Sequence, residues 1–135
     1  GFSQPQSLHI GLAAGKKIDA RFDVAFPNTT RVLGEHAITE RLFGMLQMHR
    51  LDAVLEDRVH VLYSLDAVEL DRVRNAGCLP PKEEYVAFSP ANPESPQLAE
   101  AFSHGLAQLR RSGRLQHIVQ SYVPNWDHLP APILP

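Results

Sequence analysis

Two acidic side chains flank a short apolar run in the middle of the chain. Residues 51–57 read Leu-Asp-Ala-Val-Leu-Glu-Asp, so Asp52 stands near the entrance of the run and Asp57 just past its end. The near-continuous apolar character of Leu51 to Leu55 predicts a central strand of a parallel sheet, buried on both faces. In open α/β sheets, ligands bind beyond the carboxyl ends of the strands. Asp57 is therefore a candidate partner for a ligand cation, and it also suits the N-cap of a following helix.

Other charged residues carry weaker signals. Lys16 and Lys17 follow an apolar run in the turn Ala-Gly-Lys-Lys and have the charge to meet an acidic ligand, although adjacent lysines in a turn are usually only solvated. Asp52, at the start of a strand, is interpreted as structural. Trp126 is interpreted as a residue that pins the end of the chain to the domain, with stacking on a ligand as the alternative.

Signatures of catalysis and of metal binding are missing from the sequence. It contains no G-x-S-x-G, P-loop, G-x-G-x-x-G or H-E-x-x-H motif. The seven histidines show no H-x-x-x-H spacing, and the single cysteine, Cys78, has no neighbouring base. Glu56 and Asp57 are adjacent, and adjacent residues on a strand point to opposite faces. We therefore predict no enzyme, no metal site and no cofactor.

Composition narrows the class of protein. The chain has 135 residues, 44% hydrophobic and 21% charged, which suits one domain with its own core. It has no apolar run of about 18 residues, so membrane insertion by a helix is not expected. The net charge is −2 and the basic residues are scattered, which argues against a nucleic-acid surface. The opening residues 1–6 are interpreted as a processed or trimmed end.

Strands and helices are expected to alternate along the first two thirds of the chain. Helical spacing is clearest in Ile38 to His49, where apolar residues recur on one face. We predict strands over residues 8–13, 29–33 and 51–55, and helices over residues 38–49, 58–65 and 68–75. This order predicts an α/β fold with a mostly parallel, doubly wound sheet and helices on both faces.

The remaining third is predicted to contain one more strand and two helices. The strand is expected over residues 84–88. The first helix begins at Ser95 as N-cap, carries an apolar stripe from Leu98 to Leu109, and closes at Gly113 in a left-handed conformation. The second helix is predicted over residues 114–122. The proline-rich residues 123–135 are expected to be irregular.

Two segments of this chain resemble a known family. The first is the helix followed by R-L-D-A-V-L-x-D at residues 50–57. The second is Phe-Ser-Pro at residues 88–90, a loop, and a helix ending Leu-Arg-Arg-Ser-Gly-Arg-Leu-Gln-His-Ile at residues 109–118. Together they resemble the second lobe and closing segment of type II periplasmic solute-binding proteins, the amino-acid receptors of ABC importers. The resemblance covers residues 8–122 of a single domain, 1–135. Residues 8–84 are similar to the second lobe, and residues 85–122 to the segment that returns to the first lobe.

This resemblance assigns roles to three residues. It implies that Asp57 binds a ligand ammonium group and that the N–H of Gly15 meets the anionic end of the ligand. Family members carry hydroxyl residues after this glycine, where this chain has Lys16 and Lys17, so Lys16 is expected to meet the anionic end instead. The family's first lobe, with its carboxylate-binding arginine, has no counterpart here. We therefore expect either a fragment or a standalone module.

The missing lobe also bears on association. Apolar surface that the first lobe would cover favours self-association. We expect a homodimer, with exchange of the C-terminal helices as one route, and a tightly repacked single domain as the alternative.

The sequence thus predicts a non-enzymatic periplasmic domain that binds amino acids or similar small polar solutes. An ABC-transporter permease or a sensor is the expected protein partner. One alternative is a sensory or partner-binding module of the same fold that binds no solute, which the Lys16 substitution favours. A second alternative is the effector domain of a cytosolic regulator.

Overall fold

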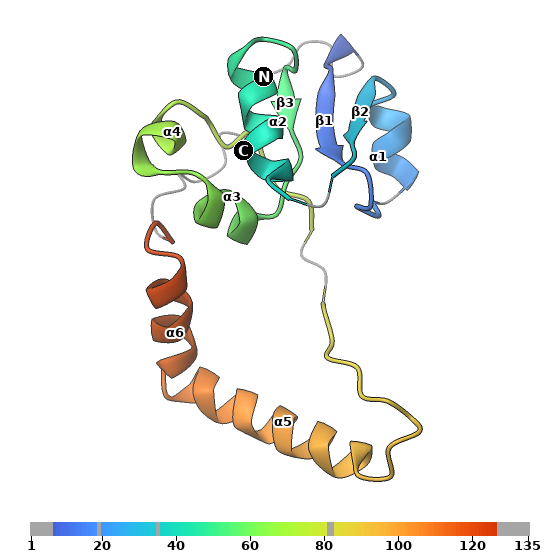
Figure 1. Ribbon diagram of the computed structural model, residues 1–135, viewed down its shortest axis with the longest axis vertical. Helices are drawn as coiled ribbons and strands as arrows, with labels where there is room; N and C mark the ends of the chain where they lie inside the picture. Colours follow the sequence, from blue (N-terminus) through green and yellow to red (C-terminus); the bar gives the residue numbers. More distant parts are fainter. Residues whose placement is uncertain (1–6, 19, 35, 81–82, 127–135) are drawn as a thin grey trace.

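The computed structural model describes residues 7–18, 20–34, 36–80 and 83–126. They form an α/β fold with a small three-stranded parallel sheet and helices around it (Figure 1). The strands are β1 (Ile10–Ala13), β2 (Thr29–Val32) and β3 (Ala53–Val54). The helices are α1 (Ala20–Ala25), α2 (Ile38–Gln47), α3 (Arg58–Ser64), α4 (Ala67–Asp71), α5 (Ser95–Arg111) and α6 (Arg114–Tyr122).

Strand β1 lies at the centre of the sheet, in the order β2-β1-β3. It pairs with β2 along its whole length, whereas β3 matches only Ile10 and Gly11. The prediction that residues 51–55 form the central strand is therefore wrong. The apolar run was expected to be buried on both faces, but Ala53 and Val54 are only half-buried because β3 lies at an edge of the sheet.

Asp52 joins the beginnings of β1 and β3, as its structural interpretation implied. Its carboxylate accepts a hydrogen bond of 2.8 Å from the N–H of His9, and its own N–H donates one of 2.8 Å to the carbonyl of His9. These two bonds set the register of the two strands. The register in turn brings their carboxyl ends to the same edge of the sheet.

Most of the buried hydrophobic side chains in the described residues fall into two clusters that meet at Val54. One lies between the sheet and α2, and its buried members are Val32, Leu42 and Leu51. The other lies among α2, α3 and α4, and also receives Val123 from just beyond α6; its buried members are Phe43, Val61, Leu62, Leu65, Leu70 and Val123. The helical spacing seen in residues 38–49 thus supplies one face of α2 to both clusters, and the bounds of α2 and α3 agree closely with the prediction.

We call the three-stranded sheet with α1 to α4 the body of the molecule, and residues 83–122 the arm. The arm leads away from the body and returns to it. An extended segment leads away from the sheet, α5 crosses below the body, and α6 leads back toward α3 and α4 (Figure 1). The prediction of a strand over residues 84–88 is wrong, since this stretch has no strand to pair with. Tyr85 is 82% exposed there. Helix α5 packs on α6, and Ser95 is its only buried residue.

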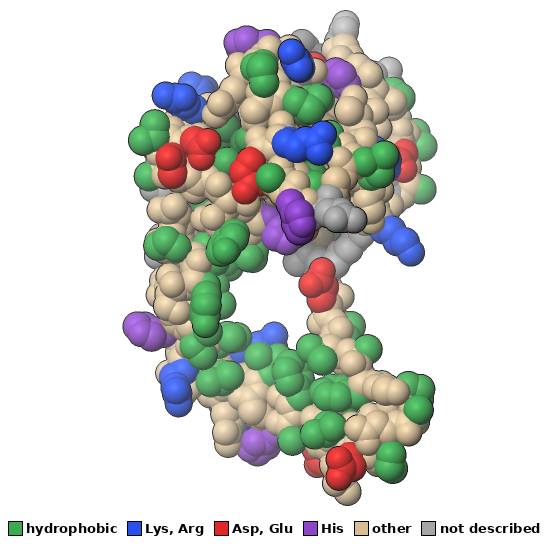
Figure 2. Space-filling view, viewed as in Figure 1, with side chains coloured by type: hydrophobic (Ala, Val, Ile, Leu, Met, Phe, Trp, Pro, Cys, Tyr) green, Lys and Arg blue, Asp and Glu red, His purple; other side chains and the backbone are tan. Residues whose placement is uncertain are grey.

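The arm does not pack tightly onto the rest of the chain (Figure 1). The structure thus differs from the tightly repacked single domain that the sequence analysis named as the alternative to a homodimer. Figure 2 shows an opening between the arm and the body, with hydrophobic side chains gathered along the inner side of the arm. Leu98 and Phe102 of α5 are each 45% exposed, and Phe102 contacts the ring of Phe88 at 6.2 Å between centroids.

The ends of the arm helices follow their sequence signals within one residue. Gly113, between α5 and α6, has φ 73°, the left-handed conformation predicted for it. Helix α5 has Glu94 as its N-cap, so Ser95 is the first helical residue rather than the cap. The predicted irregular tail begins at Val123, and residues 127–135 lie outside the described residues. Within the described ranges, no helix combines the length and the apolar character that crossing a membrane requires.

Candidate functional site

The three site residues named from the sequence come together at the carboxyl edge of the sheet. Gly15 and Lys16 follow β1, and Asp57 follows β3. The Nζ atom of Lys16 lies 2.9 Å from Oδ2 of Asp57, so the two form an ion pair. The lysine thus faces an acid of its own chain, whereas the resemblance had suggested the anionic end of a ligand. Gly15 is exposed beside it, with open space around its α-carbon.

Asp57 occupies the N-cap position of α3, as predicted, but its side chain forms no capping hydrogen bond. The carboxylate is 64% exposed and turns toward Lys16. Since the helix does not use this carboxylate, the N-cap interpretation does not account for it. The Asp57 side chain remains open to a ligand from the solvent side.

Glu56 is the site residue that sequence reasoning missed. Its side chain is only 3% exposed and also forms an ion pair with Lys16. The same carboxylate accepts a 2.8 Å hydrogen bond from the Asp57 N–H and long ones, of 3.4 Å each, from Thr39 Oγ1 and His60 Nδ1. The sequence argument placed Glu56 and Asp57 on opposite faces of a strand. Both instead reach one ammonium group, because residues 55–57 lie beyond the end of β3 and no longer follow strand geometry.

The charges of Lys16 and Glu56 stabilise each other. Burial alone raises the pKa of Glu56, but the hydrogen bonds from Lys16 and the Asp57 N–H, with the lysine charge, lower it below its ordinary value. Burial likewise lowers the pKa of Lys16, but its hydrogen bonds to Glu56 and Asp57, and their charges, raise it overall. Both groups therefore stay ionised across the neutral range.

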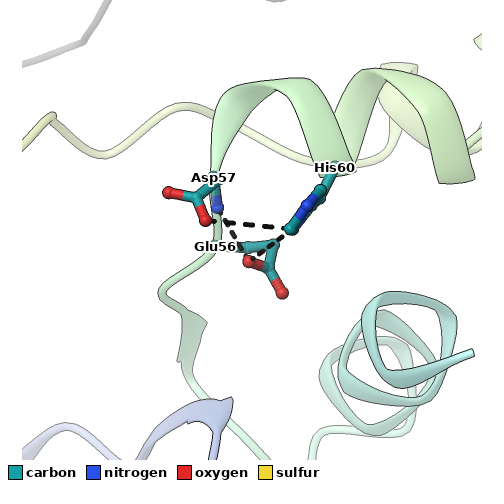
Figure 3. A group of neighbouring side chains, drawn as sticks. All are labelled: Glu56, Asp57 and His60. Atoms are coloured by element: carbon teal, nitrogen blue, oxygen red, sulfur yellow. Dashed lines mark hydrogen bonds and ion pairs between the residues drawn. The ribbon is translucent and has the colours of Figure 1, made fainter. Parts of the chain in front are cut away.

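His60 completes a group with the donor types of a metal site. Ligand atoms of Glu56, Asp57 and His60 all lie within 4.8 Å of one another (Figure 3). Carboxylates and an imidazole suit a divalent transition metal. Here, however, both carboxylates already bind the Lys16 ammonium, whose positive charge would repel a dication. The spacing Glu-Asp-x-x-His was not singled out from the sequence, where the search covered histidine pairs.

An open depression of about 600 Å³ lies beside this cluster. It is formed by the segments that follow β1, β2 and β3, the first turn of α2 and one face of α3. The residues that line it are Ala13, Gly15, Lys16, Gly34, His36, Ala37, Ile38, Thr39, Glu40, Glu56, His60, Tyr63 and Ser64. Strands β2 and β3, which both follow β1 in sequence, lie on opposite sides of it, and crevices at such reversals of strand order commonly bind ligands.

The arrangement defines a class of site, namely a polar depression at the carboxyl ends of parallel strands with a buried acid and an exposed acid sharing one lysine. Comparison of the chain with protein-family models, curated proteins and solved structures found no match.

Proposed function

We propose that this chain is a non-enzymatic ligand-binding domain for small polar solutes, with amino acids as the leading class. The observation that carries the proposal is the position of Asp57, an exposed carboxylate beside the depression at the carboxyl ends of β1 and β3. A carboxylate there is suited to an ammonium group of a bound solute.

The proposal also includes the detailed architecture of the fold, a doubly wound sheet with helices on both faces. The strand order β2-β1-β3 and the parallel pairing suit a doubly wound lobe with helices on both faces, like the second lobe of a periplasmic solute-binding protein. On the basis of that likeness, we also propose a periplasmic location and a protein partner such as an ABC-transporter permease or a sensor. These follow from the resemblance of residues 50–57 and 88–118 alone.

The walls of the depression suggest how a zwitterionic solute would lie. Its ammonium group would face Asp57, which does not line the depression itself but directly follows the lining residue Glu56. Its polar or anionic end would face the exposed backbone at Gly15 and the first turn of α2, whose backbone N–H groups and dipole favour negative charge.

The ionisation states support binding over catalysis. A nucleophilic lysine needs a lowered pKa, and that of Lys16 is raised. A general acid at neutral pH needs a raised carboxyl pKa, and that of Glu56 is lowered. The two groups suit electrostatic recognition of a charged solute.

One observation favours a second candidate function, a partner-binding module of the same fold that binds no solute. The Lys16 ammonium already forms ion pairs with the two acids that a solute cation would meet. In that case the exposed apolar side chains of the arm would be the working surface.

A thermal-shift panel of amino acids and polyamines, run on the wild type and Asp57→Asn, tests the proposal. We expect a solute that raises the melting temperature of the wild type and has a much smaller effect on Asp57→Asn. Glu100→Gln is the control, because Glu100 is an exposed acid on α5 that does not line the depression. Equal stabilisation of wild type and Asp57→Asn would contradict the role of Asp57, and no shift from any compound would favour the partner-binding module.

A further inference from the structure

The two carboxylates that share Lys16 differ sharply in how firmly they are held. Glu56 is 3% exposed and has Thr39, His60 and a backbone N–H as additional partners. The Asp57 side chain is 64% exposed, and among the described residues its carboxylate has, besides Lys16, only the imidazole of His60 at 3.8 Å. An exposed ion pair exchanges its partners readily, whereas a buried carboxylate that loses its cation is left unpaired.

The Lys16 ammonium is placed where a solute ammonium would be placed. It lies 2.9 Å from Asp57 Oδ2, the distance of a charge-assisted hydrogen bond, and its side chain forms part of the wall of the depression. Because the lysine is attached to the turn after β1, its local concentration at the acids is high, and it competes with any cation from solution.

We propose that Lys16 is a tethered occupant of the cation subsite at Asp57, and that a solute ammonium group binds by displacing it from Asp57 while its ion pair with Glu56 persists. This inference rests on the proposed function and specifies its ligand. With Glu56 neutralised internally, one negative charge remains for exchange, so the subsite selects a solute with a single primary ammonium group there.

The proposal has a direct consequence for affinity. When a ligand competes with an internal group, its apparent affinity is the intrinsic affinity of the free subsite multiplied by the fraction of molecules in which the group has left it. Removal of the Lys16 charge should therefore strengthen binding of a simple ammonium ion. A cation that bound at Asp57 without displacing Lys16 would also gain affinity from the lost lysine charge. The response of the Lys16 Nζ resonance to the ligand therefore decides between displacement and a simple charge effect.

The test is an NMR titration with propylammonium chloride, followed at the backbone amides of Asp57 and His60, with sodium chloride at equal concentration as the reference. Lys16→Met should bind propylammonium at least about tenfold more tightly than the wild type. Lys17→Met removes the same charge one residue along and should match the wild type. Lys16→Arg keeps the positive charge and should bind no more tightly than the wild type.

A second measurement covers the case in which Lys16→Met does not fold. In wild-type protein with ¹⁵N-labelled lysine, propylammonium should shift the Lys16 Nζ resonance together with the Asp57 amide. An Asp57 amide that shifts while the Lys16 resonance stays fixed would overturn the proposal, as would equal affinities in Lys16→Met and Lys17→Met. If propylammonium binds Lys16→Met but no solute binds the wild type, the tethered occupant stands and the proposed function fails. If solutes bind through Asp57 with the same affinity in Lys16→Met as in the wild type, the proposed function stands and the tethered occupant is ruled out.

Discussion

Glu56 shows how a buried charge is accommodated at the edge of this small sheet. Its carboxylate is held by the lysine after β1, by the first turn of α2 and by the backbone at the start of α3. Two segments that are distant in sequence, the turn after β1 and the first turn of α2, thus converge on one side chain beside α3. Its removal should affect the stability of the fold as well as the site.

The Glu56 carboxylate should give the protein an acid-sensitive stability. Its pKa is lower in the folded state than the ordinary value of 4.5, so its contribution is present above that value and is lost as the pH falls through the folded pKa. We expect Glu56→Gln to destabilise the protein at neutral pH by about 1–3 kcal/mol, the usual cost of an unpaired buried polar group. The variant should also lose less stability than the wild type between about pH 5 and pH 3.

Urea unfolding across this pH range measures the effect. Glu40→Gln is the control, because Glu40 is an exposed acid on the wall of the same depression. If Glu40→Gln and Glu56→Gln have the same stability at neutral pH, the ion pair with Lys16 does not contribute to folding.

The candidate site was partly predictable at the scale of single residues. Asp57 and Lys16 follow two apolar runs, and parallel strands bring their carboxyl ends to one edge, so local patterns were enough to single these two out, whereas Gly15 was named only through the family resemblance. The ion pair between Lys16 and Asp57 depends on the side-by-side placement of β1 and β3, which no local pattern specifies. Glu56 was missed because its role requires the chain to leave strand geometry at residue 55.

At the scale of elements, β1 packs closely against α2 and against Leu51, which precedes β3. A Cβ atom at Gly11 would lie 2.4 Å from Leu51 Cδ1 and 2.9 Å from Leu42 Cδ2. Leu42 and Leu51 are both almost fully buried, so neither side chain has free space to move into.

Gly11→Ala should therefore destabilise the protein by about 1–3 kcal/mol, the usual range for overpacking of a core. Gly44→Ala is the matched control, since a Cβ atom there meets nothing within 4 Å. Because Gly44 lies inside α2, the control should be neutral or stabilised by up to about 1 kcal/mol. Thermal unfolding of both variants is the measurement, and a Gly11→Ala protein as stable as Gly44→Ala would contradict the packing described for β1.

Helices were predicted better than strands, for a physical reason. The apolar face of α2 repeats with the helical period over ten residues, and Gly113 marks the end of α5 by its own backbone preference. A strand exists only where another strand supplies hydrogen bonds. Residues 84–88 have a strand-like composition but lie alone in the arm, and β3 shrinks to two residues because it pairs with only part of β1.

At the scale of the whole molecule, the body and the arm are organised differently. The body has two core clusters, whereas α6 has no buried residue and α5 has one. The arm is attached at its far end by Val123 in the core and by Arg58, which lies over the Trp126 ring at 5.0 Å and donates a 2.7 Å hydrogen bond to its carbonyl. The interpretation of Trp126 as a residue that pins the chain end to the domain is confirmed.

The open arm leaves the predicted homodimer as the outcome to test. Its apolar side chains include Leu98 and Phe102, and a second copy can cover them. We expect light scattering to detect dimer at tens of micromolar (roughly the range in which weak interfaces fill), and Phe102→Asp to shift the protein to monomer. Val24→Asp on α1 is the control, since Val24 is 79% exposed on the body. A wild-type protein that is monomeric throughout this range would rule out the homodimer.

The proposed solute site at the carboxyl edge of the sheet is tested most directly by mapping where a ligand binds. Backbone amide shifts should be followed by NMR while the best solute of the thermal-shift panel is added to the wild type. A solute bound at this edge should perturb amides around Gly15 and Lys16, the first turn of α2, and Glu56 to His60, and Asp57→Asn should abolish the saturable shifts. Perturbations confined to α5 and α6, or saturable shifts that persist unchanged in Asp57→Asn, would contradict it.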